Sequence, residues 1–208
     1  MGRYNGPVCR LCRRAGEKLF LKGERCFSPK CAIDKRPTPP GQVTGRRKRL
    51  SERGIQLREK QKARWTYGLL ERQMVKYYQD AKMKPGMTGQ TLLQRLELRL
   101  DNTFYRLGFA DSRKQARELI VQGHIMVNGA KMDIPSARVN IGDVIGFVES
   151  SKKSGFYKER IKDLQRKPIP GWLSLDTTTV TGKVIAEPQI SDMDTKIEDR
   201  LIVEYYSR

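Results

Sequence analysis

The stretch 111–129 constrains the fold more than any other part of the chain, because it specifies a short helix that leads directly into a hairpin. Ser112 is a favoured N-cap residue, and Gln115 three positions later completes a capping box. Gly123 is expected to end the helix. A segment of alternating polarity follows, and the Asn-Gly pair at 128–129 is a strong signal for a two-residue hairpin turn.

The predicted helix carries its positive charge at the unfavourable end. Arg113, Lys114 and Arg117 lie in its first turns, where cations oppose the helix dipole by a few tenths of a kcal/mol each. An anionic partner outside the protein would explain this placement, and a solvated charged face is the alternative. We expect this face to gather the following RNA-binding side chains: Arg106, Ser112, Arg113, Lys114, Arg117, His124 and Asn128. Alanine at Arg113 and Arg117 should then weaken RNA binding and leave stability level or slightly higher.

The net charge of the whole chain points to the same class of partner. The 208 residues contain 42 Lys and Arg against 23 Asp and Glu, which gives +19. Such self-repulsion is typical of nucleic-acid-binding proteins. A membrane surface is disfavoured because the chain has no long apolar run, and residues 1–7 lack the apolar stretch of a signal peptide. We therefore expect a cytoplasmic protein that binds neither a membrane nor a small-molecule substrate.

The positive charge is concentrated in the N-terminal half. Residues 1–91 carry 23 Lys and Arg against 7 Asp and Glu, whereas 92–208 carry 19 against 16. A helical pattern begins at Ser51, after a basic block. The cations expected to neutralise RNA phosphates here are Arg46, Arg47, Lys48, Arg49, Arg53, Arg58, Lys60, Lys62 and Arg64.

Hydrophobic periodicity predicts the remaining elements. A second helix is expected over 71–82, and apolar residues at spacings of three and four predict one continuous helix over 92–107. Further strands are expected near 138–139, 144–148, 172–175 and 201–206, and a basic helix over 156–166. We assign Leu100, Phe104, Ala116, Leu119 and Ile120 to the core.

All four cysteines lie in the first 31 residues, as two close pairs: Cys9, Cys12, Cys26 and Cys31. Two such pairs about a dozen residues apart are typical of a structural Zn²⁺ site with four thiolate ligands. The segment has few large apolar side chains, so a metal is expected to hold it together. Nearby cations should offset the thiolate charge and lower the thiol pKa values: Arg10, Arg13, Arg14, Lys22, Arg25 and Lys30.

The cysteines also allow other interpretations. An iron–sulfur cluster could use the same four ligands, although zinc is favoured. Disulfides are disfavoured because the chain shows no export signal. A thioredoxin-like redox pair is disfavoured because Cys9 and Cys12 do not follow a strand in a βαβ unit.

The sequence gives little support for catalysis. His124 is the one histidine, and neither a phosphate-binding Gly-rich loop nor a dinucleotide-binding motif occurs. We therefore predict that the protein is not an enzyme.

Residues 95–147, above all the run from Ser112 to Gly129, resemble the S-four RNA-binding module. This module occurs in a ribosomal protein, in some tRNA synthetases and pseudouridine synthases, and in a heat-shock protein. Both enzyme classes need a catalytic domain that this chain does not supply. With the module, further segments resemble the zinc-binding, four-cysteine type of the bacterial or organellar small-ribosomal-subunit protein S-four family: 1–14, 22–26, 28–31, 39–41, 57–62, 67–68, 71–73, 100–102, 105–110, 172–176 and 203–208.

These observations together predict an α+β fold in four parts. They are a zinc-binding unit held by its metal (1–45), a basic helical region (46–91) that packs with C-terminal strands (168–208), an inserted S-four module of helices and a small antiparallel sheet (92–155), and a connecting basic helix (156–167).

The resemblance implies a structural role in the small ribosomal subunit. It implies binding of small-subunit rRNA early in assembly, a position beside protein S-five near incoming mRNA, an influence on decoding accuracy and repression of the protein's own operon. The alternative is a zinc-dependent basic regulator that binds RNA or DNA outside the ribosome. A redox-switched thiol protein is a third class.

Overall fold

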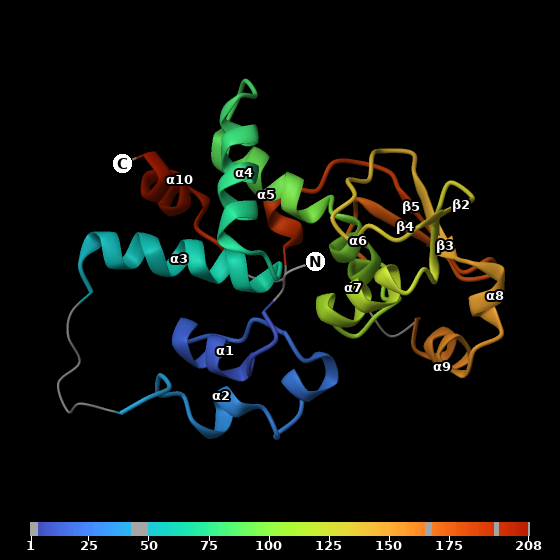
Figure 1. The fold of residues 1–208 in the computed structure, drawn as a ribbon, viewed down its shortest axis with the longest axis horizontal. Coiled ribbons are helices and arrows are strands. Elements are labelled where there is room, and N and C mark those ends of the chain that lie inside the picture. The colour runs from blue at the N-terminus through green and yellow to red at the C-terminus, as the bar shows by residue number, and fades with distance from the viewer. Residues whose placement is uncertain (1–3, 43–49, 165–167, 194–195, 208) are drawn as a thin grey trace. The chain divides into compact units, whose positions relative to one another are not determined.

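The computed structural model describes residues 4–42, 50–164, 168–193 and 196–207 (Figure 1). The chain divides into two compact units. Unit 1 comprises residues 1–93 and 194–208, and unit 2 comprises residues 94–193. Helices and a small antiparallel sheet together confirm the α+β class.

The N-terminal segment of unit 1, residues 4–42, has little regular structure. It contains α1 (Cys9–Ala15), the 3-10 helix η1 (Gly23–Cys26) and the short α2 (Ala32–Lys35). Its buried cluster consists of Cys12, Ala15 and Leu19, against which Leu21 and Trp65 pack. So small an apolar core agrees with the expectation that something other than burial must stabilise this segment.

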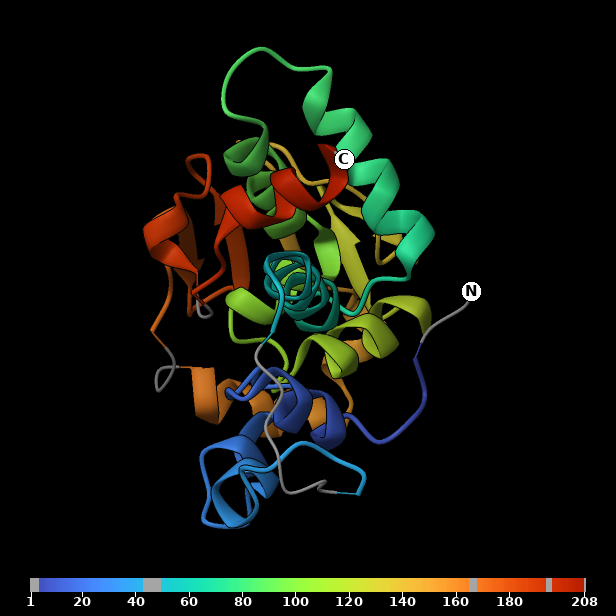
Figure 2. The same ribbon diagram turned by 90° about the vertical axis from the view of Figure 1, so that its left-hand side faces the viewer.

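Longer helices form the rest of unit 1. They are α3 (Glu52–Thr66), α4 (Glu71–Lys82), the first part of α5 (Thr88–Glu97) and α10 (Asp199–Ser207). The predicted start of the first of these helices is confirmed: the Ser51 hydroxyl accepts a hydrogen bond from the Gly54 amide and caps α3. In both views α10, drawn in red, lies beside α3 (Figures 1 and 2).

The strand predicted over 201–206 is wrong, because these residues form α10. Their β-branched and aromatic composition favours a strand, but tertiary packing overrides this local preference. Ile202 is completely buried, and the ring of Tyr206 stacks on that of Tyr78 at 4.8 Å between centroids. Gln56 Nε2 of α3 donates a 3.0 Å hydrogen bond to Glu204.

The single helix predicted over 92–107 is also wrong, because it breaks between α5 and α6 (Leu100–Arg106). At the break, the Val139 amide donates to the Leu98 carbonyl and the Leu100 amide donates to the Ala137 carbonyl. Backbone pairing with a distant segment therefore replaces the helical hydrogen bonds at residues 98–100. The predicted strand near 138–139 is reduced to one bridge between Arg99 and Arg138.

Within its described residues, unit 2 forms a five-stranded antiparallel sheet in the order β2-β1-β3-β5-β4. The strands are β1 (Ile125–Val127), β2 (Ala130–Met132), β3 (Val144–Phe147), β4 (Leu173–Asp176) and β5 (Thr181–Val184). Strand β5 was not predicted, because it contains Gly182 and Lys183, which both have low strand preference. A Cβ at Gly182 would lie 2.4 Å from Leu107, so the close approach of that side chain requires glycine.

The predicted domain boundary at 168 needs correction. Strand β5 pairs with β3 through Val144 and Lys183, and β4 pairs with β5, so residues 168–193 extend the sheet of the module. The part of the C-terminal segment that packs with the basic helices is α10. Residues 168–193 belong to unit 2 because β5 forms hydrogen bonds with the edge of β3. The sequence does not reveal that this edge of β3 is open.

The predicted helix and hairpin at 111–129 are confirmed. Helix α7 (Arg113–Val121) begins at Ser112, whose hydroxyl accepts from the Gln115 amide, and the Gln115 side chain accepts from the Asp111 amide. It ends in a Schellman motif, in which the Gly123 amide donates to Ile120 and the His124 amide to Leu119.

A large apolar core underlies the sheet of unit 2. It runs from Leu98 to Val184, contains every residue assigned above to the core, and includes Trp172. Two more helices follow β3: α8 (Glu149–Lys152), which the sequence does not predict, and α9 (Gly155–Asp163), which confirms the predicted basic helix.

Candidate nucleic-acid interface

Most cations of α3 form hydrogen bonds and ion pairs with other residues of unit 1. Arg58 donates from Nε and Nη2 to the Ala15 carbonyl, at 3.1 and 2.6 Å, and so caps the C-terminal end of α1. Lys62 is buried and forms ion pairs with Glu17 at 2.9 Å and Glu59 at 3.0 Å. Burial lowers the pKa of Lys62, but the two carboxylates outweigh it and the net shift is upward.

Lys60 and Arg64 both pair with Glu71, the first residue of α4. Lys60 is buried, with its Nζ 2.7 Å from Glu71 Oε1, and Arg64 Nη1 lies 3.5 Å from the other carboxylate oxygen. Tyr206 of α10 donates to the same carboxylate at 3.0 Å. Burial raises the pKa of Glu71, but these partners outweigh it and hold the pKa below its ordinary value.

Arg53 is exposed near the start of α3. Its guanidinium lies 4.5 Å from the centroid of the Tyr205 ring, and its Nη1 donates to the Tyr205 carbonyl. The block Arg46–Arg49 lies outside the described residues, so its predicted contacts stay predictions.

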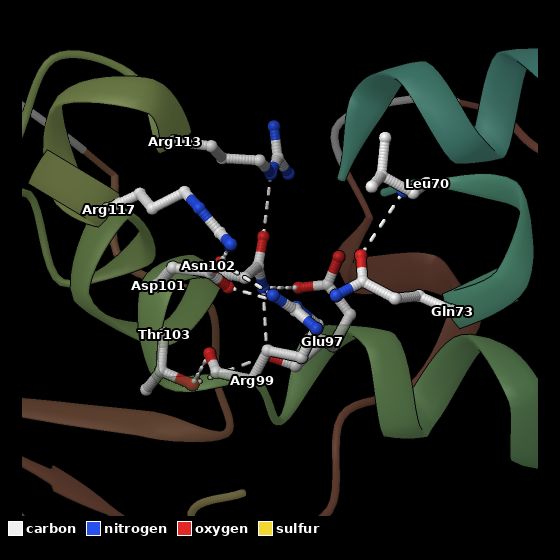
Figure 3. Close-up of polar contacts among 9 residues, drawn as sticks. All are labelled: Leu70, Gln73, Glu97, Arg99, Asp101, Asn102, Thr103, Arg113 and Arg117. Atoms are coloured by element: carbon white, nitrogen blue, oxygen red, sulfur yellow. Dashed lines mark hydrogen bonds and ion pairs between the residues drawn. The ribbon is translucent and has the colours of Figure 1, made fainter. Parts of the chain in front are cut away.

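A buried polar network joins α5, α6 and α7 of unit 2 (Figure 3). Arg106 forms a two-bonded ion pair with Glu97, at 3.0 Å for each nitrogen. Asp101 accepts from Arg99 at 3.0 and 2.7 Å and from Arg117 at 3.0 Å. All five of these side chains are buried.

Arg113 belongs to the same network. Its Nε donates to Asn102 Oδ1 at 2.7 Å, and its guanidinium lies 4.6 Å from the centroid of the Tyr105 ring. Asn102 in turn donates to the Glu97 carboxylate at 2.8 Å. The network fixes α7 against the corner between α5 and α6.

The structure therefore argues against our expectation that alanine at Arg113 and Arg117 leaves stability level or slightly higher. Both residues are buried and their side chains are hydrogen-bonded, so the loss of these side chains leaves buried partners unsatisfied. The helix spacing predicts one face correctly, but that face packs inward against α6. Lys114, between them, is exposed.

The other predicted RNA-binding residues of unit 2 also have internal contacts. Ser112 caps α7, and His124 Nδ1 lies 2.9 Å from the Ser151 hydroxyl. Asn128 has the positive φ of the hairpin turn, donates to Asp143 and accepts from the Val144 amide. The structure does not gather these side chains and Arg106 into one exposed face, and their RNA-binding roles stay predictions.

The four cysteines carry free thiols, and Cys12, Cys26 and Cys31 are buried. Burial raises the pKa of Cys12, and charge interaction with the other three thiols adds to the rise. Burial likewise raises the pKa of Cys26, contrary to the lowering predicted from nearby cations.

The chemistry of the donor set fits a soft metal ion, since all four candidate ligands are thiols, and the Lys22 amide donates to Cys26 Sγ at 3.3 Å. Among the described residues, however, no group of three or more Cys, His, Asp or Glu side chains has the geometry of a metal site.

The sequence does not predict a second group of cations that could bind a ligand together. Arg25, Lys30, Lys35 and Arg36 are exposed around a hollow in the N-terminal segment. Arg25 and Lys30 were expected only to offset the thiolate charge. Their proximity depends on the path of the chain between the cysteines, which the spacing alone does not reveal.

Two family profiles cover most of the chain. Residues 3–97 match the ribosomal protein S4/S9 N-terminal domain, and residues 98–145 match the S4 domain. The boundary between the two matches coincides with the break between α5 and α6.

Several full-length relatives have the same name. Small ribosomal subunit protein uS4 of Heliobacterium modesticaldum is 52% identical over 208 residues, with both chains covered completely. The proteins of that name from Dehalococcoides mccartyi and Thermus thermophilus are 50% and 49% identical, again over the full length of both chains. The chain belongs to the uS4 family.

Membership of the uS4 family confirms the predicted resemblance at the level of the family and of its RNA-binding domain. Proteins of this family are structural and non-enzymatic, which agrees with the prediction that the chain is not an enzyme. No helix in the described part of the chain is long and apolar enough to cross a membrane.

Proposed function

We propose that this protein is a structural constituent of the small ribosomal subunit in the cytoplasm, where it binds small-subunit rRNA. The full-length identity to proteins named small ribosomal subunit protein uS4 carries this proposal. The S4 domain over 98–145 and the charge of +19 support RNA as the ligand.

Binding to a small-subunit rRNA transcript tests the proposal. We expect tight binding with a steep salt dependence, because phosphate contacts release counterions. Co-sedimentation with small subunits in high salt distinguishes a structural constituent from the alternative, a regulator outside the ribosome. Elution of the protein under these conditions would contradict the proposal, and family membership does not favour that alternative.

We further propose that Cys9, Cys12, Cys26 and Cys31 hold one structural Zn²⁺. The spacing of the two cysteine pairs and the small apolar cluster around Cys12 support it. Metal analysis of the purified protein checks the ion: iron in place of zinc would keep the ligands and change the metal, whereas neither metal would refute the site. Reversible metal loss under mild oxidant would instead favour the redox-switched class.

The resemblance supports finer proposals about neighbours. We propose contact with protein S-five and with mRNA where it enters the subunit, a role in early assembly and decoding accuracy, and repression of the protein's own operon. Chemical crosslinking in purified subunits tests the two contacts, and a reporter carrying the operon's leader tests repression.

A further inference from the structure

A hollow of about 820 Å³ lies in the N-terminal segment of unit 1, among α1, η1 and α2. Its walls carry five cationic side chains: Arg13, Arg25, Lys30, Lys35 and Arg36. We propose that this hollow binds phosphate groups of the RNA backbone. The proposal rests on the proposed rRNA-binding function and gives it a site.

Charge is the first argument for a phosphate ligand. One carboxylate, that of Glu24, faces five cations in the hollow. Among the described residues, Arg25, Lys30, Lys35 and Arg36 have no ion-pair partner, and the nearby Asp34 pairs with Lys18 at 2.7 Å. Like charges gathered in one place repel, and a bound polyanion relieves that repulsion.

The contrast with the other basic residues strengthens this argument. Lys60 and Lys62 of α3 are buried against carboxylates, and Arg117 of α7 is buried against Asp101. Those cations serve the fold. In the described structure Arg25, Lys30, Lys35 and Arg36 are exposed and pair with no carboxylate, so their charge is available to a ligand.

Local hydrogen bonds shape the hollow before a ligand binds. Arg13 donates from Nε to the Thr38 carbonyl at 2.9 Å, which fixes the direction of its guanidinium. Ser28 donates from Oγ to the Arg25 carbonyl at 3.1 Å and accepts from the Lys30 amide at 3.3 Å. These bonds set the turn that presents two of the cations, so less ordering is required on binding.

The residue types of the lining favour a charged ligand over an apolar one. Ala32 is its one apolar residue, whereas sites for drug-like molecules are lined mainly by apolar and aromatic side chains. Arginine and lysine together provide forked and point-like donors that suit phosphate oxygens.

The hollow is also tied to the cysteine cluster through the chain. Arg13 directly follows Cys12, Arg25 directly precedes Cys26, and Lys30 directly precedes Cys31. Whatever holds the cysteines together therefore also holds the cations together, and we expect loss of that constraint to weaken phosphate binding at this site.

The test is a triple variant, Arg25→Gln, Lys30→Gln and Lys35→Gln, in the full-length protein. The matched control removes the same charge from exposed lysines of unit 2: Lys158→Gln, Lys162→Gln and Lys183→Gln. Because all six side chains are exposed, we expect unchanged circular dichroism and melting for both proteins.

Affinity for a small-subunit rRNA transcript is measured against salt concentration. For the hollow variant we expect affinity to fall about tenfold and the salt slope to decrease by about two, as phosphate contacts are lost. The control should change less, and Glu24→Gln should bind more tightly than the parent. Equal losses in the hollow and control variants, or no loss in the hollow variant, would overturn the proposal.

Titration of tripolyphosphate into the parent and the hollow variant tests whether the ligand of the hollow is RNA or a free polyphosphate. If the variant loses tripolyphosphate binding but binds rRNA like the parent, the RNA assignment is wrong. If the parent itself does not bind the transcript, the proposed function fails, which differs from failure of the hollow alone.

Discussion

Unit 2 and the N-terminal segment of unit 1 use two different means to hold their chains together. In unit 2 the rings of Phe104, Phe109, Phe147 and Tyr157 form a continuous aromatic cluster with centroid separations of 5.0–5.3 Å. In residues 4–42 the buried cluster consists of two small residues, Cys12 and Ala15, and of Leu19. The first region has a large apolar core, whereas the small core of the second is the reason that we propose an additional constraint there.

The two regions also use positive charge differently. Arg99, Arg106 and Arg117 are buried in ion pairs, whereas Arg25 and Lys30 face a solvent-accessible hollow. Both sets look alike in the sequence, as Lys and Arg near an expected binding element. Burial by the surrounding fold decides which cations serve structure and which remain available to RNA.

Loss of the cysteine constraint should have the largest effect. Cys31→Ser, or chelation of bound metal, should unfold residues 4–42, because metal-binding free energies of roughly 10 kcal/mol are coupled to folding in such sites. Limited trypsin digestion with mass spectrometry should show rapid cleavage there, while unit 2 stays resistant. Ser28→Ala is the matched control and should remain resistant. A chelated protein as resistant as the parent would remove the contrast between the two regions.

Breaking the buried network should have the next largest effect. Asp101→Ala leaves Arg99 and Arg117 buried without their carboxylate, so we expect a loss of roughly 3–5 kcal/mol in the stability of unit 2. Urea unfolding followed by Trp172 fluorescence, with Trp65→Phe in the background, reports on this unit. The exposed Asp133→Ala should change stability by about 0.5 kcal/mol or less. Equal stability of the two variants would show that the network does not stabilise unit 2.

Local signals were sufficient to predict much of the fold. The cap at Ser112, the stop at Gly123 and the hairpin turn at Asn128 each involve residues close in sequence, and the structure confirms all three. The same holds for the start of α3 at Ser51. In each case the stabilising interaction lies within a few residues of the chain.

Non-local contacts explain the errors. The break between α5 and α6 depends on pairing with residues 137–139, and the helical state of 199–207 depends on packing against α3 and α4. For the candidate site, periodicity placed Arg113 and Arg117 on one face correctly. It could not show that Asp101 and Asn102, more than ten residues earlier, cover that face.

Single substitutions in α7 sharpen the comparison between structural and available cations. Arg113→Ala and Arg117→Ala should each destabilise unit 2 by about 1–3 kcal/mol, because each removes a charged hydrogen bond to a buried partner. Lys114→Ala should change stability by about 0.5 kcal/mol or less, since this side chain is exposed. The same urea unfolding measures all three. If Lys114→Ala were as destabilising as Arg117→Ala, burial would not be the feature that separates these cations.

The smallest effect should appear as a pH dependence of unit 1, where Glu71 joins α3, α4 and α10. Its pKa is lowered in the folded protein, so the folded state favours the ionised carboxylate. The stabilisation is complete above the ordinary pKa of 4.5 and is lost as the pH falls through the lower folded value. Because 43% of the side chain is exposed, solvent screening should keep the effect at about 1 kcal/mol or less.

Glu71→Gln tests this dependence. The stability difference between the parent and the variant should be largest at neutral pH and should shrink below pH 4.5. Trp65 fluorescence during urea unfolding, with Trp172→Phe in the background, follows unit 1, and Glu187→Gln corrects for the loss of one exposed negative charge. A difference that stayed constant from pH 7 to pH 3 would mean that the contacts of Glu71 with Lys60 and Tyr206 stabilise its neutral and ionised forms equally. The ion pairs of α3 would then contribute to unit 1 through packing rather than charge.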